Sequence, residues 1–111
     1  MSAQKEIIVV QNDKLYPLNF TLTDEQDFAL DLSGATLQLN VQRPGASAIK
    51  FTGNMDIDND PATGKCSYTV QDGNFDETGS YYAEIVVTFP NSQVLTFPNI
   101  IIKALPRLAR E

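Results

Sequence analysis

The part of the sequence that most constrains the fold spans residues 77–89, where a turn leads into a regularly alternating segment. Gly79 supplies the turn, and Tyr81 follows two residues later. From Ala83 to Phe89 an apolar side chain occupies every second position, which predicts a long, half-buried β-strand. A tyrosine at the start of such a strand ties the preceding corner through its hydroxyl group. The segment therefore predicts a β-structure that is pinned at one corner.

Corners of this kind are typical of immunoglobulin-type sandwiches, in which the tyrosine stands two residues before a disulfide cysteine. Ala83 occupies that cysteine position here, so the predicted core has no inter-sheet disulfide. The single cysteine, Cys66, alternates with Tyr68 and Val70, which predicts a small buried hydrophobic side chain. One cysteine and no histidine cannot build a structural zinc site, and they leave a nucleophile without its usual base.

Seven segments show the two-residue period of strands, and no long window shows a helical one. They span residues 6–10, 15–23, 35–42, 48–57, 65–71, 79–89 and 92–103. Pro17 lacks an amide donor and predicts an edge or a bulge, whereas Gly53 predicts a bulge or a close backbone approach. In the last segment we expect the inward face to change around residues 98–99. The pattern predicts an all-β, Ig-like antiparallel β-sandwich of about seven strands.

The length of 111 residues fits a single domain, residues 1–111, with arms expected at residues 1–5 and 104–111 and a brief helical turn at residues 105–110. We find no apolar segment typical of a signal peptide or of a membrane span, which favours folding in the cytoplasm of a host cell. The net charge of −6 disfavours binding to nucleic acid or to an anionic membrane surface.

The charge is unevenly distributed along the chain. Residues 103–111 carry Lys103, Arg107 and Arg110 against one acidic residue, whereas the preceding residues are strongly acidic. Two interpretations stay open for this basic tail: it docks on the acidic face of a neighbouring copy, or it is a solvated terminus.

One acidic cluster is a candidate calcium site. Asp56, Asp58 and Asp60 have the spacing that opens an EF-hand loop. However, Pro61 stands where that loop needs its glycine, and Ser67 stands where it needs a bidentate glutamate. The alternative is a turn in which these side chains bond the local backbone. No other residue set indicates a metal or a cofactor.

A second acidic cluster lies in the loop of residues 24–34. Its carboxylates, Asp24, Glu25, Asp27 and Asp31, suggest either a solvated loop or a pair for glycoside hydrolysis, but the chain has no Trp for sugar stacking. Phe28 in the same loop is predicted either to plug one end of the sandwich or to anchor a partner. No group of residues here argues for catalysis.

Several phrases resemble one family when they are taken in order. They are LYPLNFTL at residues 15–22, DLSGATL at 31–37, TGKCSY at 63–68, TGSYYAE at 78–84 and LTFP at 95–98. This order is similar to the N-terminal domain of phage baseplate upper proteins, over nearly the whole chain. The resemblance implies an Ig-like module of a virion, with symmetric assembly and no catalysis. Such proteins usually continue past this domain, so we expect a stand-alone accessory protein or a domain of a longer one.

These observations favour a non-enzymatic virion structural protein of a tailed phage or prophage, in the baseplate, the tail or the capsid. Its expected partners are other virion proteins and its own copies in a symmetric homo-oligomer. The residues expected to make these contacts are Ile8, Val10, Phe28, Lys103, Arg107 and Arg110. The alternative is a bacterial cell-surface or carbohydrate-binding Ig-like module. A small glycan hydrolase is the third hypothesis, which the residue inventory disfavours.

Overall fold

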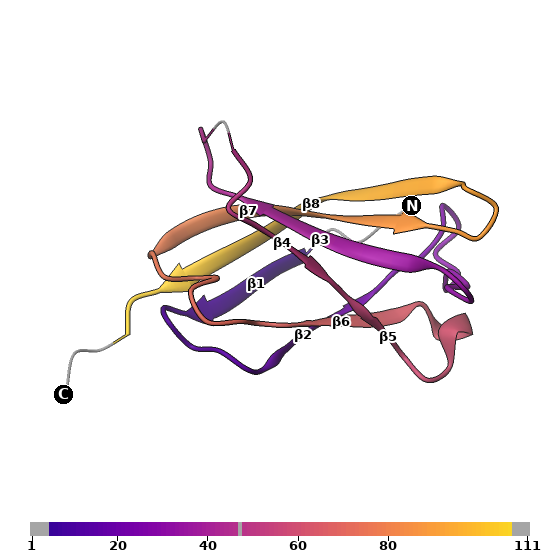
Figure 1. The fold of residues 1–111 in the computed structure, drawn as a ribbon, viewed down its shortest axis with the longest axis horizontal. Coiled ribbons are helices and arrows are strands. Elements are labelled where there is room, and N and C mark those ends of the chain that lie inside the picture. The colour runs from indigo at the N-terminus through magenta and orange to yellow at the C-terminus, as the bar shows by residue number, and fades with distance from the viewer. Residues whose placement is uncertain (1–4, 47, 108–111) are drawn as a thin grey trace.

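Two β-sheets face each other across a shared hydrophobic core in the computed structural model, which describes residues 5–46 and 48–107 (Figure 1). The eight strands are β1 (Lys5–Val10), β2 (Pro17–Thr21), β3 (Thr36–Gln42), β4 (Phe51–Asn54), β5 (Asp56–Ile57), β6 (Lys65–Thr69), β7 (Gly79–Thr88) and β8 (Val94–Leu105). One short 3-10 helix, η1 (Pro61–Thr63), lies between β5 and β6.

The larger sheet has the strand order β1-β8-β7-β3-β4, and the smaller sheet has the order β2-β6-β5. The ladders are antiparallel except for the one that joins β1 to β8, which is parallel and pairs Lys5 with Ile100 and Val10 with Leu105. This arrangement is the Ig-like β-sandwich that the sequence predicts. Pro17 begins β2, an edge strand of the smaller sheet, where its missing amide costs no ladder hydrogen bond.

The segment of residues 48–57 is not one strand, as the sequence analysis expects, but two strands in different sheets. The chain crosses between the sheets at the buried Met55, whose amide donates to the carbonyl of Leu37 at 3.0 Å. The prediction of one strand over residues 48–57 is therefore wrong, and Ile49, which precedes β4, is 52% exposed. Gly53 marks a close approach, because a Cβ atom there would overlap the ring of Tyr68 from the opposite sheet.

The long strand β8 changes its inward face near residue 99. The register against β7 shifts between Ala83 and Ile85, and Asn99 adopts a positive φ of 71°. Phe97 and Ile100 are consequently both buried although they lie three positions apart. The predicted change of face around residues 98–99 is confirmed.

The core is built from the inward side chains of both sheets, with Cys66 buried among them as a free thiol. Aromatic rings connect the two sheets at one end. Tyr68 stacks on Phe51 at a centroid distance of 5.8 Å, and Phe51 meets Phe75 edge to face at 5.5 Å. Phe75 then meets Tyr81 edge to face at 5.1 Å. These contacts link the sheets in a core that has no disulfide.

Tyr81 also closes the corner before β7. Its ring is completely buried, and its hydroxyl donates to the carbonyl of Glu77 at 2.7 Å and accepts from the amide of Glu77 at 3.2 Å. Arg43 covers the ring, with its guanidinium carbon 4.7 Å from the centroid, and donates to the carbonyl of Thr78 at 3.0 Å. Gly79 turns the chain at this point with a φ of 111°. The position of this tyrosine in the sequence predicts this corner.

The chain termini contain more sheet than the sequence analysis expects. Lys5, Ala104 and Leu105, which were expected in the terminal arms, belong to β1 and β8. Leu105 therefore does not start a helical turn, because it pairs with Val10 in the parallel ladder. Residues 106 and 107 are not helical either, and residues 108–111, which include Arg110, lie outside the described residues.

Replacing Tyr81 with Phe keeps the buried ring but removes both hydroxyl contacts to Glu77. We expect the free energy of unfolding to fall by about 1–2 kcal/mol, because the corner loses its side-chain partner. Urea denaturation measures the change. Tyr82→Phe is the matched control, because its side chain is exposed and its loss is expected to stay within about 0.5 kcal/mol. Equal stabilities for the two variants would contradict the role of the corner.

Candidate assembly surfaces

Within the described part of the chain, β1 is an edge strand of the larger sheet and pairs with β8 alone. The amide of Gln11 donates to the carbonyl of Leu105 at 2.8 Å, so in this parallel ladder the odd-numbered residues of β1 bond toward β8. The backbone groups of Ile8 consequently point away from the sheet, toward the open edge. Its side chain is 64% exposed on the outer face. Ile8 thus offers a partner both backbone hydrogen-bonding groups and an apolar side chain.

Val10 is less available than Ile8. Its side chain is half-buried, and its carbonyl accepts from the amide of Asp13 at 3.1 Å, where the chain turns away from the sheet. The open part of the edge is therefore centred on Ile8, with Glu6 as its neighbour on the same face.

The basic residues near the C-terminus bind acidic groups of their own chain. Lys103 lies on β8, and its ammonium group contacts the Glu6 carboxylate on β1 at 2.7 Å. The hydrogen bond and the charge of Glu6 raise the pKa of Lys103 above its usual value. Arg107 binds Asp13 at 2.6 Å. Both pairs are about half exposed and contribute little to stability.

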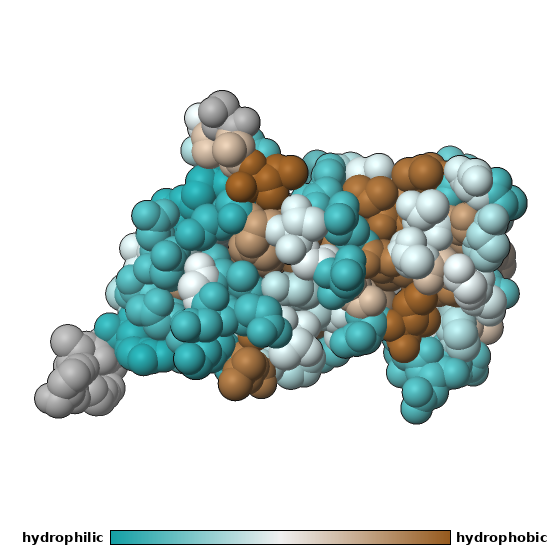
Figure 2. All heavy atoms as spheres, viewed as in Figure 1, coloured by the Kyte–Doolittle hydropathy of each residue, from teal (hydrophilic) through white to brown (hydrophobic). Residues whose placement is uncertain are grey.

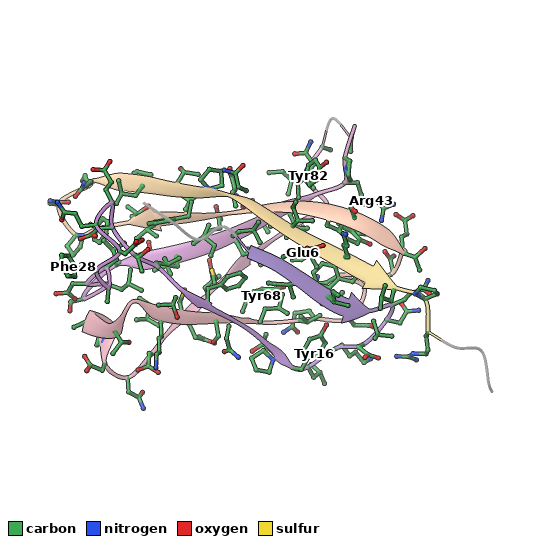
Figure 3. The ribbon with its side chains drawn as sticks, turned by 180° about the vertical axis from the view of Figure 1, so that it is seen from behind. Glu6, Tyr16, Phe28, Arg43, Tyr68 and Tyr82 are labelled. Atoms are coloured by element: carbon green, nitrogen blue, oxygen red, sulfur yellow. The ribbon has the colours of Figure 1, made fainter. Side chains whose placement is uncertain are left out.

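Phe28 does not plug the sandwich, because its side chain is 67% exposed (Figure 3). The reason is local. The Asp24 carboxylate accepts hydrogen bonds from the amides of Gln26 at 2.8 Å and Phe28 at 3.0 Å, which fixes a tight turn. Leu22 and Leu32, on either side of this loop, are completely buried and supply its contacts with the core. The plug hypothesis is wrong, and the prediction that Phe28 anchors a partner stays open.

The carboxylates of the loops mostly bind their own backbone. Asp58 accepts from the amide of Asp60 at 3.1 Å, and Asp60 accepts from the amide of Ala62 at 3.2 Å, which caps η1. In the other loop, the hydroxyl and the amide of Ser33 lower the pKa of Asp31. Over the described part of the chain, no three His, Cys, Asp or Glu side chains gather as metal ligands would. The geometry of Asp58 and Asp60 is that of the turn interpretation, whereas Asp56 lies exposed on β5.

Further exposed apolar side chains lie on the larger sheet, and the sequence patterns do not point to them. Tyr82 on β7 is 54% exposed, and Ile101 and Leu105 on β8 are also exposed. Ile101 is paired with Tyr82 across the two strands. Their outward positions follow from the alternation of each strand, but the alternation does not say which outward side chains gather on one face.

A family model described as the BppU N-terminal domain, a family of phage baseplate upper proteins, matches residues 2–106. The chain belongs to this family. The resemblance that the sequence phrases indicate is therefore confirmed. This BppU N-terminal domain is accordingly a phage baseplate-associated structural protein, and its family places it in the virion. No curated protein matches the chain.

Solved structures show the same fold. A chicken TCR structure superposes with a TM-score of 0.63 at 8% identity, covering 99% of this chain and 57% of that one. CopC from Methylosinus trichosporium OB3b gives a TM-score of 0.53 at 14% identity, covering 99% of this chain and 91% of that one. Identities this low show the fold alone, and the BppU N-terminal domain spans little more than half of that TCR chain. In the described residues we find no helix of the length and apolar character that crossing a bilayer requires.

The acidic turn at residues 56–60 gives a direct test of the calcium hypothesis. Because Asp58 and Asp60 bond the local backbone, we expect about 1 mM CaCl2 or an excess of chelator to shift the melting temperature by less than about 1 °C. Differential scanning calorimetry with MgCl2 as the ionic-strength control measures the shift. A stabilisation of several degrees by calcium alone would overturn the turn interpretation.

Proposed function

We propose that this domain is a docking module that joins other virion proteins and copies of itself within the phage baseplate. The observation that carries the proposal is the open edge of β1, where the backbone and the side chain of Ile8 are both accessible. The membership in a baseplate family supports it, because baseplates are built from many copies of proteins that must hold one another. The domain acts by binding and performs no chemistry.

The edge of β1 is suited to accept an extended segment of a neighbour. A strand added there would take its affinity from main-chain hydrogen bonds and its specificity from the side chain of Ile8. The parallel ladder holds β1 against β8 from Lys5 to Val10, so the edge is formed before a partner arrives. A preformed edge lowers the ordering cost of binding.

Phe28 supplies a second proposed contact at the opposite end of the sandwich. An exposed aromatic ring on a loop held by the Asp24 hydrogen bonds is a rigid apolar anchor. In a symmetric assembly each weak contact is repeated, so two modest surfaces on every copy are enough to hold the domain. We place the proposed symmetric homo-oligomer in the assembled particle.

A carbohydrate-binding module is the second candidate, because Tyr82 presents an exposed aromatic ring on an outer sheet face. Sugar platforms usually combine aromatic rings with a polar cleft. Phe28, the other strongly exposed aromatic side chain of the described residues, lies at a different end of the molecule (Figure 3). The two rings therefore do not form one platform, and the docking role is better supported.

The proposed function predicts a location in the particle. With an antibody raised against this chain, we expect immunogold electron microscopy of purified phage to label the tail tip. Labelling spread over the capsid would instead indicate a head accessory protein. Particles without label, with the protein found elsewhere in the culture, would contradict the virion role and favour the surface-module alternative.

Incorporation of variants into purified phage particles tests whether the β1 edge is used for docking. We expect Ile8→Lys combined with Val10→Lys to leave a folded domain that no longer enters the particle, because two lysines disfavour strand pairing at an edge. Thr21→Lys is the matched control, because it adds a charge to an exposed position of β2 on the other sheet. Normal incorporation of the Ile8/Val10 variant would refute the use of the β1 edge.

A further inference from the structure

The two outer faces of the sandwich differ in chemical character. The outer face of the smaller sheet carries Asn19 and Thr21 from β2 together with Lys65, Ser67 and Thr69 from β6. Among the described residues, none of the large exposed hydrophobic residues belongs to β2, β5 or β6, although the exposed Leu15 stands just before β2. The outer face of β1, β8 and β7, here called the β8 face, presents Ile8, Ile101, Leu105 and Tyr82. Exposed apolar side chains gather on the β8 face but not on the strands of the smaller sheet. This difference marks the β8 face as a contact surface.

The β8 face also carries little net charge in a chain whose net charge is −6. Glu6 is neutralised by Lys103 at 2.7 Å, and Glu84 accepts a hydrogen bond from the side-chain amide of Asn40 at 3.0 Å. By contrast, the loop residues 24–31 and 56–60 hold seven of the fourteen acidic residues. Two copies of an acidic chain repel each other unless they meet where the charge is low or balanced. The β8 face meets this condition.

The β8 face has a hollow on one side of β8 and an exposed apolar side chain on the other. The loop between β3 and β4 projects away from the sheets, and Figure 2 shows hydrophobic side chains at its base. A hollow of about 340 Å³ lies between this loop and the irregular part of β8, lined by Ile49, Tyr82, Pro98 and Asn99 among others. Figure 3 places Tyr82 beside this loop. On the other side of β8, the side chain of Ile8 stands out from β1.

We propose that the β8 face binds a second copy of this chain, face to face, about a two-fold axis that runs along β8. Such an axis places β1 of each copy over β7 of the other, so that Ile8 of one copy approaches the Tyr82 hollow of its partner. Ile101, which pairs with both Glu6 and Tyr82, lies at the centre of the contact. The interface is isologous, as in most closed dimers. The inference names one partner of the proposed docking role and rests on that role.

Sedimentation equilibrium of the purified 111-residue chain tests the proposal. We expect a species of twice the 12.2 kDa chain mass for the wild type. Tyr82→Lys and Ile101→Lys should each weaken association about tenfold or more, because a two-fold contact buries each added charge twice. Thr21→Lys, on the polar face of the other sheet, should associate like the wild type. Urea denaturation of each variant shows whether it is folded, and Tyr82→Lys, at an exposed position, is expected to keep its stability.

Two results would overturn the inference. The first is a wild-type chain that stays monomeric up to about 0.5 mM, a concentration at which even weak specific contacts are populated. The second is a dimer that survives Tyr82→Lys and Ile101→Lys while both variants are folded. A chain that is monomeric in solution but still labels the tail tip of the particle would contradict this inference and leave the docking role intact. The failure of this inference is thereby distinguished from the failure of the proposed function.

Discussion

The contact on which this sandwich most depends is the one between Tyr81 and the corner that precedes its strand. Tyr81 is completely buried, its hydroxyl binds both backbone groups of Glu77, and its ring meets Phe75. Through Phe51 the same aromatic contacts reach Tyr68 in the smaller sheet. Immunoglobulin-type folds often join their two sheets with a disulfide. Here Ala83 stands at the cysteine position, so core packing and the Tyr81 corner join the sheets instead.

The surfaces proposed for assembly depend on this corner through the order of the strands. β7, which carries Tyr81, lies at the centre of the larger sheet; β8 pairs with β7, and β1 pairs with β8. The outer edge is thus two strands away from the corner that fixes the sheet. Two ion pairs, Glu6–Lys103 and Asp13–Arg107, join the first and last described parts of the chain at that edge. An assembly module needs this arrangement: a rigid centre and a defined, accessible periphery.

Local patterns in the sequence predict the elements and their inward faces. The alternation from Ala83 to Phe89, the place of Tyr81 and the burial of Cys66 all follow from side-chain period and corner chemistry, which act over a few residues. The predictions from the sequence are wrong where contacts with distant segments determine the local structure. Nothing near Met55 shows that the chain crosses there to the other sheet, and nothing near Phe28 shows that Leu22 and Leu32 already supply the core contacts. The ion pairs of Lys103 and Arg107 could not be predicted for the same reason, because their partners Glu6 and Asp13 lie at the other end of the sequence.

The candidate surfaces were predictable only in part. Ile8 is visible in the sequence as an apolar residue of a terminal strand, but its place at an open edge follows only from the parallel pairing of β1 with β8. Tyr82 and Ile101 come from different strands, and only the register between β7 and β8 brings them together. The alternation within one strand predicts which of its side chains face outward. The order and register of the strands then decide which outward side chains lie together on one surface.

Amine cross-linking of intact particles, followed by mass spectrometry, tests most directly whether the domain docks through the side formed by β1 and β8. Lys103 lies on that side, and Lys65 lies exposed on β6 in the other sheet. We expect cross-links from Lys103 to other virion proteins or to further copies, which are distinguished by mixing isotope-labelled and unlabelled chains, and fewer intermolecular cross-links from Lys65. Intermolecular cross-links from Lys65, with none from Lys103, would contradict docking through this side.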